Sequence, residues 1–319
     1  MPWLQLKAHI APEQAELLED LLLAEGATAI TLQDAQDDPL FEPERGTTPL
    51  WDETVLTGLY DDLEGLPAML ERLAAAWAEA MPGEPCPTID HELLDDRDWE
   101  RAWMDDFQPL KMGQRLWIVP SWHEVPDADA VNLLLDPGLA FGTGTHPTTA
   151  LCLEWLDGLA VAGELADRQT LDVGCGSGIL AIAALKLGAA AATGTDIDPQ
   201  ALTASRDNAE RNGVAEPDFR LCYPEQLEAS ARFPLVIANI LAGPLIELAG
   251  EIAGRVAPGG RLALSGILEA QAEEVLEAYR DQGLVMDEPA VREGWVRLTG
   301  HRPAEGRPAE GRPAEGRPD

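Results

Sequence analysis

The chain has 319 residues, 45% of them hydrophobic, so it is long enough for two domains with a sizeable apolar core. Its 57 acidic and 22 basic residues give a formal net charge of −35. This charge argues against direct binding of nucleic acid or an anionic membrane, because both partners require clustered Lys and Arg. The acidity either speeds the encounter with a basic partner or reflects adaptation to a salty cytoplasm, and both can hold.

The four cysteines are widely spaced, without a CxxC pair or a cluster of His and Cys, so we expect neither a metal site nor a disulfide scaffold. The first residues do not resemble a signal peptide, and no apolar run approaches the roughly 18 residues that a membrane span needs. We therefore expect a soluble, cytoplasmic protein. No feature predicts self-association, so we expect a monomer.

Residues 1–94 predict a small α+β domain. Alternating apolar residues predict strands and the spacing of leucines predicts helices, with strands at 3–8, 29–33, 54–60 and 87–93 and helices at 12–24 and 66–81. The order βαββαβ predicts a ferredoxin-like fold. The loop 34–52, rich in Asp, Glu, Pro and Gly, is expected to be exposed.

Residues 95–126 are expected to connect this domain to the next. Trp99, Trp103 and Phe107 recur every four residues, which places them on one face of a predicted short helix. Trp117 and Trp122 bring the connector to four of the nine tryptophans of the chain. These tryptophans either pack the joint between the domains or form an aromatic wall that faces the substrate.

Residues 127–300 alternate between strand and helix patterns, which predicts a mostly parallel sheet covered on both faces. Strands are expected at 170–173, 192–196, 219–222, 235–239, 261–265, 285–287 and 295–299, and helices at 178–187, 199–212, 244–256 and 269–282. Asp198 and Pro199 are a typical helix start, and Asn212-Gly213 a typical helix end. The tail 301–319 repeats Glu-Gly-Arg-Pro and is expected to be disordered.

The run Asp172-Val-Gly-Cys-Gly-Ser-Gly178 joins the first predicted strand of this domain to a helix. Gly174, Gly176 and Gly178 allow the backbone to adopt positive φ and to approach a ligand closely at a helix N-terminus. A dinucleotide-binding loop would have its third glycine one position later, where this chain has Ile179. Asp172 can hold an ammonium group, which S-adenosylmethionine has and NAD lacks. The loop therefore favours S-adenosylmethionine as the cofactor.

Two further residues end predicted strands, at the edge where open parallel sheets bind ligands. Asp196 is placed to accept hydrogen bonds from ribose hydroxyls, with a loop-capping role as the alternative, whereas Asp198 is interpreted as a helix cap. Asn239 is placed beside the reactive end of the cofactor, where its amide can accept a hydrogen bond from an amine nucleophile. A structural role in the turn is the alternative for Asn239.

The segment Asp136-Pro-Gly-Leu-Ala-Phe-Gly-Thr-Gly-Thr-His-Pro-Thr-Thr149 is rich in glycine and hydroxyl groups and precedes a helix that is expected to start near Pro147. Such a loop can fold over a cofactor as a lid. His146 precedes a proline at a helix start, so we interpret it as structural rather than as a catalytic base. The chain has no GxSxG elbow that would indicate a serine hydrolase.

These motifs, together with Asp98-Trp-Glu-Arg-Ala-Trp-Met104 and Asn239-Ile-Leu-Ala-Gly-Pro244, make the chain resemble the bacterial PrmA family, which methylates ribosomal protein L11 of the large subunit. The resemblance extends from Met1 to about Gly300. The loop around Thr145 and the Asn-Ile-Leu run are its most selective features, since the glycine loop is common to many methyltransferases. The Asn-Ile-Leu run takes the place of the NPPY sequence of many other amine and amide methyltransferases.

The resemblance implies a seven-stranded, Rossmann-like class I methyltransferase domain behind a ferredoxin-like domain that recognises the substrate protein. It implies that Thr145, Gly174, Asp196 and Asn239 contact S-adenosylmethionine, and that lysine side chains and the N-terminal α-amine of L11 are methylated. The alternatives are a glutamine-amide or small-molecule methyltransferase, an NAD-dependent oxidoreductase, or a binding module with a vestigial pocket. A ribosomal RNA methyltransferase is disfavoured by the net charge of −35.

Overall fold

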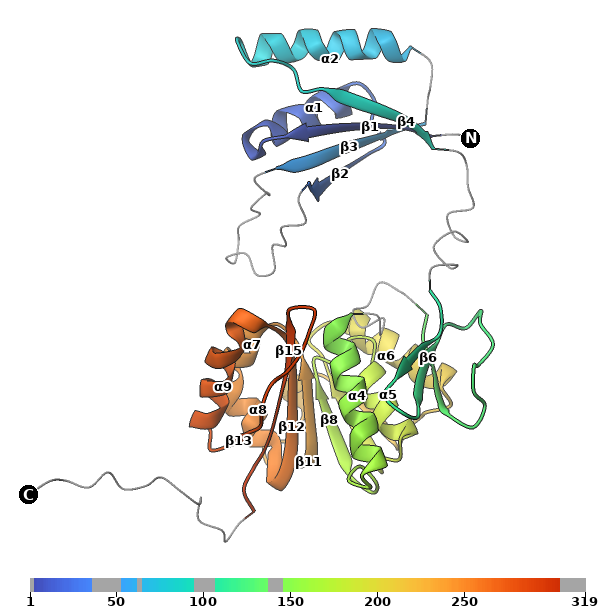
Figure 1. Cartoon of the computed structure of the whole chain (residues 1–319), viewed down its shortest axis with the longest axis vertical. Coiled ribbons are helices and arrows are strands. Elements are labelled where there is room, and N and C mark those ends of the chain that lie inside the picture. The colour runs from blue at the N-terminus through green and yellow to red at the C-terminus, as the bar shows by residue number, and fades with distance from the viewer. Residues whose placement is uncertain (1–2, 36–52, 62–64, 95–106, 137–145, 305–319) are drawn as a thin grey trace, which may run out of the picture. The chain divides into compact units, whose positions relative to one another are not determined.

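The computed structural model describes residues 3–35, 53–61, 65–94, 107–136 and 146–304. The chain divides into two compact units, Met1–Asp106 and Phe107–Asp319 (Figure 1). The expected exposed loop 34–52, the predicted helix that carries Trp99 and Trp103, and most of the predicted lid lie wholly or largely outside the described residues. Within the described residues, no helix is long and apolar enough to cross a membrane.

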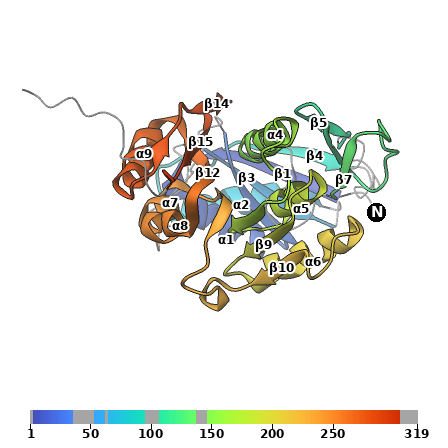
Figure 2. The same cartoon turned by 90° about the horizontal axis from the view of Figure 1, so that it is seen from below.

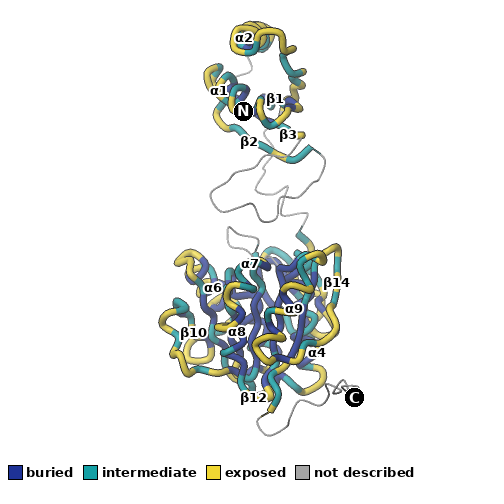
Figure 3. Tube along the Cα trace, turned by 90° about the vertical axis from the view of Figure 1, so that its left-hand side faces the viewer, coloured by how far each residue is buried: buried dark blue, intermediate teal, exposed yellow. Residues whose placement is uncertain are grey.

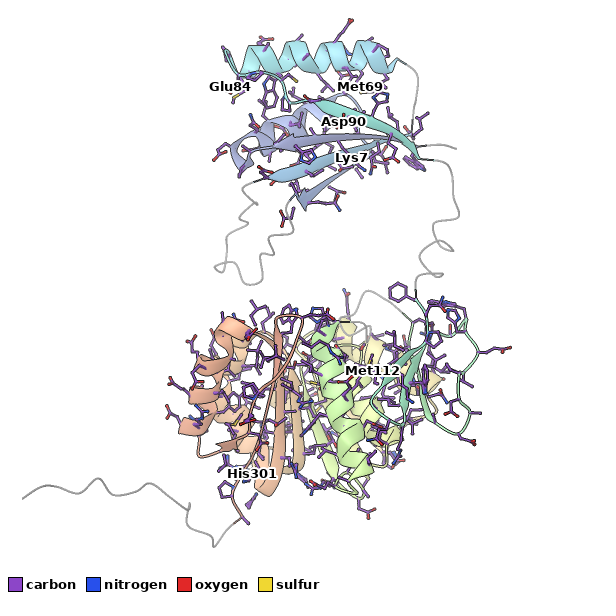
Figure 4. The ribbon with its side chains drawn as sticks, in the orientation of Figure 1. Lys7, Met69, Glu84, Asp90, Met112 and His301 are labelled. Carbon is purple, nitrogen blue, oxygen red and sulfur yellow. The ribbon has the colours of Figure 1, made fainter. Side chains whose placement is uncertain are left out.

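The first unit is a four-stranded antiparallel sheet with two helices. Its elements follow the predicted order: β1 (Trp3–Ile10), α1 (Ala15–Ala24), β2 (Ala29–Asp34), β3 (Thr54–Tyr60), α2 (Leu66–Ala80) and β4 (Ile89–Leu94). The strands lie in the order β2-β3-β1-β4. Alternate residues of β1 are buried, and they pack with Leu22 of α1 and with Met69 and Trp77 of α2 in one apolar cluster (Figure 4). The period-two pattern of β1 therefore places one face of the sheet against the helices.

The second unit is built on a larger sheet whose strands lie in the order β10-β9-β8-β11-β12-β15-β13, with β14 paired to β15. The strands are β8 (Gln169–Val173), β9 (Ala191–Thr195), β10 (Phe219–Cys222), β11 (Phe233–Asn239), β12 (Val256–Leu268), β13 (Val285–Met286), β14 (Ala290–Arg292) and β15 (Trp295–His301). Strands β10, β9, β8, β11 and β12 are parallel, whereas β15 is antiparallel to its three partners. The sheet has eight strands, one more than the seven predicted, because the short β14 follows β13 directly and lies outside the strand–helix alternation on which the prediction rests.

Helices cover both faces of this sheet (Figure 2), and its strands are largely buried beneath them (Figure 3). On one side lie α4 (Pro147–Val161), α5 (Ile179–Lys186) and α6 (Pro199–Arg211), and on the other α7 (Ala242–Glu247), α8 (Ala249–Arg255) and α9 (Ala272–Asp281). In β11, Leu235 and Ile237 belong to one apolar core, whereas Val236 and Ala238 belong to the other. The strand is therefore buried on both sides, as its continuous apolar run predicts.

Part of the predicted connector folds as a small sheet of the second unit. Strands β5 (Leu110–Met112), β6 (Leu116–Val119) and β7 (Val131–Leu134) pair in this order. The turn between β5 and β6 is fixed to α4, because the Asp157 carboxylate accepts the backbone N–H groups of Gln114 and Arg115 at 2.5 and 3.2 Å. The described part of the connector from Phe107 onward thus belongs to the second unit rather than to a separate linker.

Two predicted boundaries differ from the structure. The helix expected over 244–256 is divided at Leu248, whose ψ of 7° leaves the helical range, and Val256 already belongs to β12. The predicted tail begins too early: His301, labelled in Figure 4, is the last residue of β15. Arg302 donates side-chain hydrogen bonds of 2.7 and 2.9 Å to the carbonyls of Ala253 and Val256 at the end of α8. The tail beyond 304 lies outside the described residues.

Candidate active site

The glycine loop lies between β8 and α5 and requires its glycines. Gly174, Gly176 and Gly178 have φ angles of 69°, 53° and 77°, a region that L-residues rarely adopt. A Cβ atom at Gly174 would collide with the Ile240 side chain, and one at Gly178 would lie 2.8 Å from Oγ of Ser205. The backbone at Gly174 and Gly178 therefore lies too close to Ile240 and Ser205 to leave room for a side chain.

Neighbouring elements hold the loop through its backbone. The N–H groups of Gly174 and Cys175 donate to the carbonyl of Thr195 at 2.8 and 3.0 Å. From α6, Ser205 Oγ donates to the carbonyl of Gly176 and Asn208 Nδ2 donates to that of Ser177, both at 2.9 Å. Because these partners come from β9 and α6, the loop conformation is fixed before any ligand binds.

Asp196 follows β9 and faces the glycine loop. Its Oδ2 accepts the N–H of Gly176 at 2.9 Å, and its Oδ1 accepts the N–H of Asp198 at 3.0 Å. Each carboxylate oxygen has a second lone pair, so both remain able to accept a further hydrogen bond. Asp198 caps α6 by accepting the N–H of Gln200 at 2.8 Å, which confirms its interpretation as a helix cap.

Asp172 is a buried carboxyl group in β8, with 1% of its surface exposed. Its Oδ2 accepts the N–H of Ala181 in α5 at 3.2 Å, whereas its Oδ1 has no hydrogen-bond partner among the described residues. Burial raises the pKa of Asp172 to about 7, and the nearby charge of Asp196 contributes to the same shift. A buried oxygen without a donor indicates a place where a ligand N–H group can bind.

Asn239 is the last residue of β11. Its Nδ2 donates to Oγ1 of Thr149 in α4 at 3.3 Å, and its Oδ1 is buried without a partner among the described residues. Immediately after Asn239 the chain turns away from the sheet, and Gly266 of β12 passes so close that a Cβ there would collide with the Ile240 carbonyl. The amide of Asn239 is therefore held at one end and offers a free acceptor at the other.

Strand register brings these residues together. Val173 of β8 pairs with Thr195 of β9 on one side and with Ala238 of β11 on the other. The next residue of each strand is Gly174, Asp196 and Asn239, so the three form a row at the carboxyl edge of the sheet. This is the edge at which open parallel sheets bind their ligands.

The start of α4 borders the same edge. His146 is the N-cap of α4, and its Nδ1 accepts the N–H of Thr148 at 3.3 Å. The His146 ring lies 4.8 Å from that of Trp295 in an edge-on contact, and burial lowers the pKa of the imidazole. These contacts agree with a structural role for His146.

The sequence model of the family described as ribosomal protein L11 methyltransferase (PrmA) matches residues 2–303. The chain belongs to this family. A PrmA relative named ribosomal protein L11 methyltransferase, from Chromohalobacter salexigens, is 72% identical over 304 residues, which are 95% of this chain and 100% of that protein. A second one, from Pseudomonas aeruginosa strain LESB58, is 58% identical over 305 residues, 96% of this chain and 100% of that protein.

A solved structure supports the same assignment. The crystal structure of a ribosomal protein L11 methylase from Lactobacillus delbrueckii subsp. bulgaricus is 33% identical, with a TM-score of 0.54, and covers 62% of this chain and 100% of that chain. Membership of the PrmA family confirms the prediction of an S-adenosylmethionine-dependent protein methyltransferase with a mixed α/β fold.

Within this PrmA protein, the structure brings together Asp172, Asp196, Asn239 and the three glycines, whereas Thr145 lies outside the described residues. The roles of Thr149, Ser205 and Asn208 were not predicted from the sequence. Ser205 and Asn208 show no motif of their own, and their spacing of three residues on α6 is the only signal that they share a face. No group of three or more potential metal ligands occurs among the described residues.

Proposed function

We propose that this chain transfers methyl groups from S-adenosylmethionine to amino groups of ribosomal protein L11, on lysine side chains and on the N-terminal α-amine. The names of the PrmA family and of the relatives support L11 as the substrate. The observation that supports an amine as the acceptor is the buried Oδ1 of Asn239 beside the glycine loop, which has no hydrogen-bond partner in the part of the chain that the structure describes. A carbonyl oxygen in that place can accept a hydrogen bond from a neutral amine.

Three features of the site fit S-adenosylmethionine. The orphaned Oδ1 of Asp172 can accept a hydrogen bond from the ammonium group of the methionine part. Asp196 has lone pairs for ribose hydroxyls. Gly174, Gly176 and Gly178 adopt positive φ, which lets the backbone of the loop approach a ligand closely. Thr145 joins this set on the strength of the family resemblance.

The bound cofactor supplies a methyl group on a sulfonium, which is already activated for transfer. The chain's own contribution is to position the amine, because alignment of two reactants provides much of an enzymatic rate. Asn239 Oδ1 accepts an N–H of the amine and directs its lone pair away from that bond. The amine must arrive neutral, although a lysine has a pKa of roughly 10.4 and an α-amine one of roughly 7.7–8.0. Burial at the site lowers that pKa, and solvent takes the proton.

We assign recognition of the substrate protein to a ferredoxin-like domain over residues 1–94, followed by the connector 95–126, whose part from Phe107 onward folds with the methyltransferase domain. The order of its strands, β2-β3-β1-β4, and its two helices support this fold. The charge of the chain supports the role: residues 1–106 contain 26 acidic and 5 basic residues, whereas residues 107–319 contain 31 and 17. Adaptation to salt alone would spread the acidity evenly, so its concentration here favours attraction of a basic protein.

The same charge leads us to propose that the chain does not bind nucleic acid directly, although its substrate does. We further propose that it acts as a monomer in the cytoplasm, where ribosomal proteins are made.

The test is intact-mass spectrometry of purified L11 after incubation with this protein and S-adenosylmethionine. We expect L11 to gain the mass of one or more methyl groups, and peptide mapping to locate them on lysine and the N-terminal amine. A second basic ribosomal protein at the same concentration is the control and should stay unmodified. Unmodified L11, or methylation of glutamine amides instead of amines, would overturn the proposal.

A further inference from the structure

The turn between β14 and β15 has a backbone that does not suit its sequence. Arg292 pairs with Trp295, so Glu293 and Gly294 form a two-residue turn. Their φ angles are 51° and 77°, and a turn with positive φ at both positions favours Asn-Gly. Among the described residues, the one other non-glycine residue with positive φ is Asp167, whose residue type tolerates this region better than glutamate does. Side chains in unfavourable backbone cluster at functional sites, so Glu293 calls for a functional explanation.

Strand register places this turn at the rim of the candidate active site. Asn239 pairs with Ser265 of β12, and β12 continues beyond Ser265 to Leu268, which pairs with Trp295. Ser265 Oγ also donates to the carbonyl of Val296 at 3.1 Å, which fixes the start of β15 to the strand beside Asn239. The turn therefore lies just beyond the carboxyl edge of the sheet, where open parallel sheets bind their ligands.

The carboxylate of Glu293 is exposed, and its charge is not balanced by its neighbours. The adjacent Arg292 is directed to α4, where its Nη2 contacts both carboxylate oxygens of Glu154 at 2.9 and 3.1 Å. No ion pair among the described residues includes Glu293.

The nearby imidazole of His146 does not balance this charge either. Its ring lies 4.8 Å from that of Trp295, the residue that follows the turn. Burial lowers the pKa of His146, and the charge of Glu293 opposes this shift only in part. The imidazole is therefore neutral near pH 7, and the carboxylate of Glu293 remains an uncompensated negative charge at the rim.

From this placement we propose that Glu293 is a recognition residue for the positively charged form of the acceptor amine. Its carboxylate binds the ammonium group at the rim, before the nitrogen gives its proton to solvent and moves to Asn239. This inference rests on the proposed function, in which an amine is the methyl acceptor. A lysine with a pKa of roughly 10.4 arrives almost entirely charged at pH 7, whereas a glutamine amide is neutral and gains nothing from this contact. Glu293 thus favours amines over amides.

The test compares Glu293→Gln with the parent, and Glu288→Gln is the matched control. Glu288 is an exposed acid before β14, at the end of this strand opposite to the turn, so both variants change the net charge equally. We expect Glu293→Gln to raise KM for L11 by about two- to fivefold at low salt, which corresponds to the loss of one exposed ion pair. The kcat and the Kd for S-adenosylmethionine should stay near the parent values. High salt should remove the difference, and Glu288→Gln should leave KM unchanged.

A second variant, Glu293→Asn, separates recognition of the amine from support of the turn. Asparagine suits the positive φ of this position, so the variant should have a higher Tm than the parent. Its side chain is uncharged, so it should raise KM for L11 as Glu293→Gln does. If Glu293 served the turn alone, Glu293→Asn would give a more stable protein with the KM of the parent.

The outcomes separate this inference from the proposed function. If the parent leaves L11 unmodified or methylates glutamine amides, the proposed function fails and the inference with it. If the parent methylates amines of L11 but Glu293→Gln keeps the parent KM, only the inference is overturned. Equal increases of KM in Glu293→Gln and Glu288→Gln, or a parent-like KM in Glu293→Asn, would overturn it as well.

Discussion

The backbone N–H of Gly176 and Oδ2 of Asp196 form a hydrogen bond of 2.9 Å, which connects the glycine loop to the end of β9. Asp196 therefore has two tasks: it holds the loop in its binding conformation, and in the proposed function it accepts hydrogen bonds from the ribose. A single substitution removes both.

We expect Asp196→Ala to weaken S-adenosylmethionine binding by about 10- to 100-fold, because hydrogen bonds to charged groups contribute about 1.5–3 kcal/mol. Isothermal titration calorimetry measures the change. The matched control is Asp198→Ala, which removes a helix cap and should lower stability by about 1 kcal/mol with little effect on affinity. Equal affinity losses in the two variants would contradict a specific role for Asp196.

Binding of S-adenosylmethionine should depend on pH through Asp172. Burial raises the pKa of its carboxyl group from 3.8 to about 7, and only the ionised form attracts the ammonium group of the cofactor. Affinity should therefore fall as the pH drops below about 7, by up to about tenfold per pH unit. Titrations from pH 8 to pH 5.5 test this in the parent and in Asp172→Asn, which should bind weakly without this pH dependence.

The same shift has an opposite effect on stability. A carboxyl group whose pKa is higher in the folded state than in the unfolded state stabilises the fold at low pH. This contribution is lost as the pH rises from 3.8 to about 7. At pH 8, Asp172→Asn should therefore have a higher Tm than the parent although its cofactor affinity is lower. A lower Tm at that pH would show that the ionised carboxylate is already compensated in the free protein.

Gly178 of the glycine loop should not tolerate a side chain. Gly178→Ala forces a side chain into left-handed backbone, which costs about 1–2 kcal/mol, and also places its Cβ against Ser205. Gly213→Ala is the matched control, since Gly213 has a similar φ of 68° but no atom within 4 Å of the place that a Cβ would take. Chemical denaturation should show a larger loss for Gly178→Ala, and only this variant should lose cofactor binding.

The acidity of the first unit should speed the encounter with L11. We expect kcat/KM for L11 to fall as salt increases, and to fall by roughly threefold or more at low salt when Glu71, Glu79 and Glu84 are all changed to Lys. The matched control changes three exposed acids of α9 and its end, Glu274, Glu277 and Asp281, to Lys. Steady-state values of kcat/KM for L11, measured at two salt concentrations, compare the two triple variants with the parent. Equal effects of the two triple variants would indicate a general charge effect rather than recognition by the first unit.

Local chemistry made α6 and the glycine loop predictable from the sequence. Asp198, Pro199 and Asn212-Gly213 mark the ends of α6, and the helix spans Pro199–Arg211 with Asn212 at its C-cap. The order of helices and strands along the first unit follows from the patterns within single elements. The row of Gly174, Asp196 and Asn239 at the edge of the larger sheet follows from the rules for parallel sheets.

The features that were not predicted depend on contacts between distant segments. Thr149 was recognised only as the end of a motif, and its partner Asn239 lies on a strand that α4 reaches through tertiary packing. Strands β5, β6 and β14 are three or four residues long, and none of them follows a helix in the strand–helix alternation that located the equally short β10 and β13. Arg302 resembled part of a charged tail, because its bonds to the end of α8 leave no local signal.

The central claim is that Oδ1 of Asn239 orients the amine for methyl transfer. The most direct measurement is the single-turnover rate of the first methyl transfer to L11 by Asn239→Ala at saturating S-adenosylmethionine, compared with the parent. We predict a fall of at least about tenfold, because the loss of one hydrogen bond also releases the alignment of the amine. An unchanged rate, with the cofactor bound and the protein folded, would contradict it.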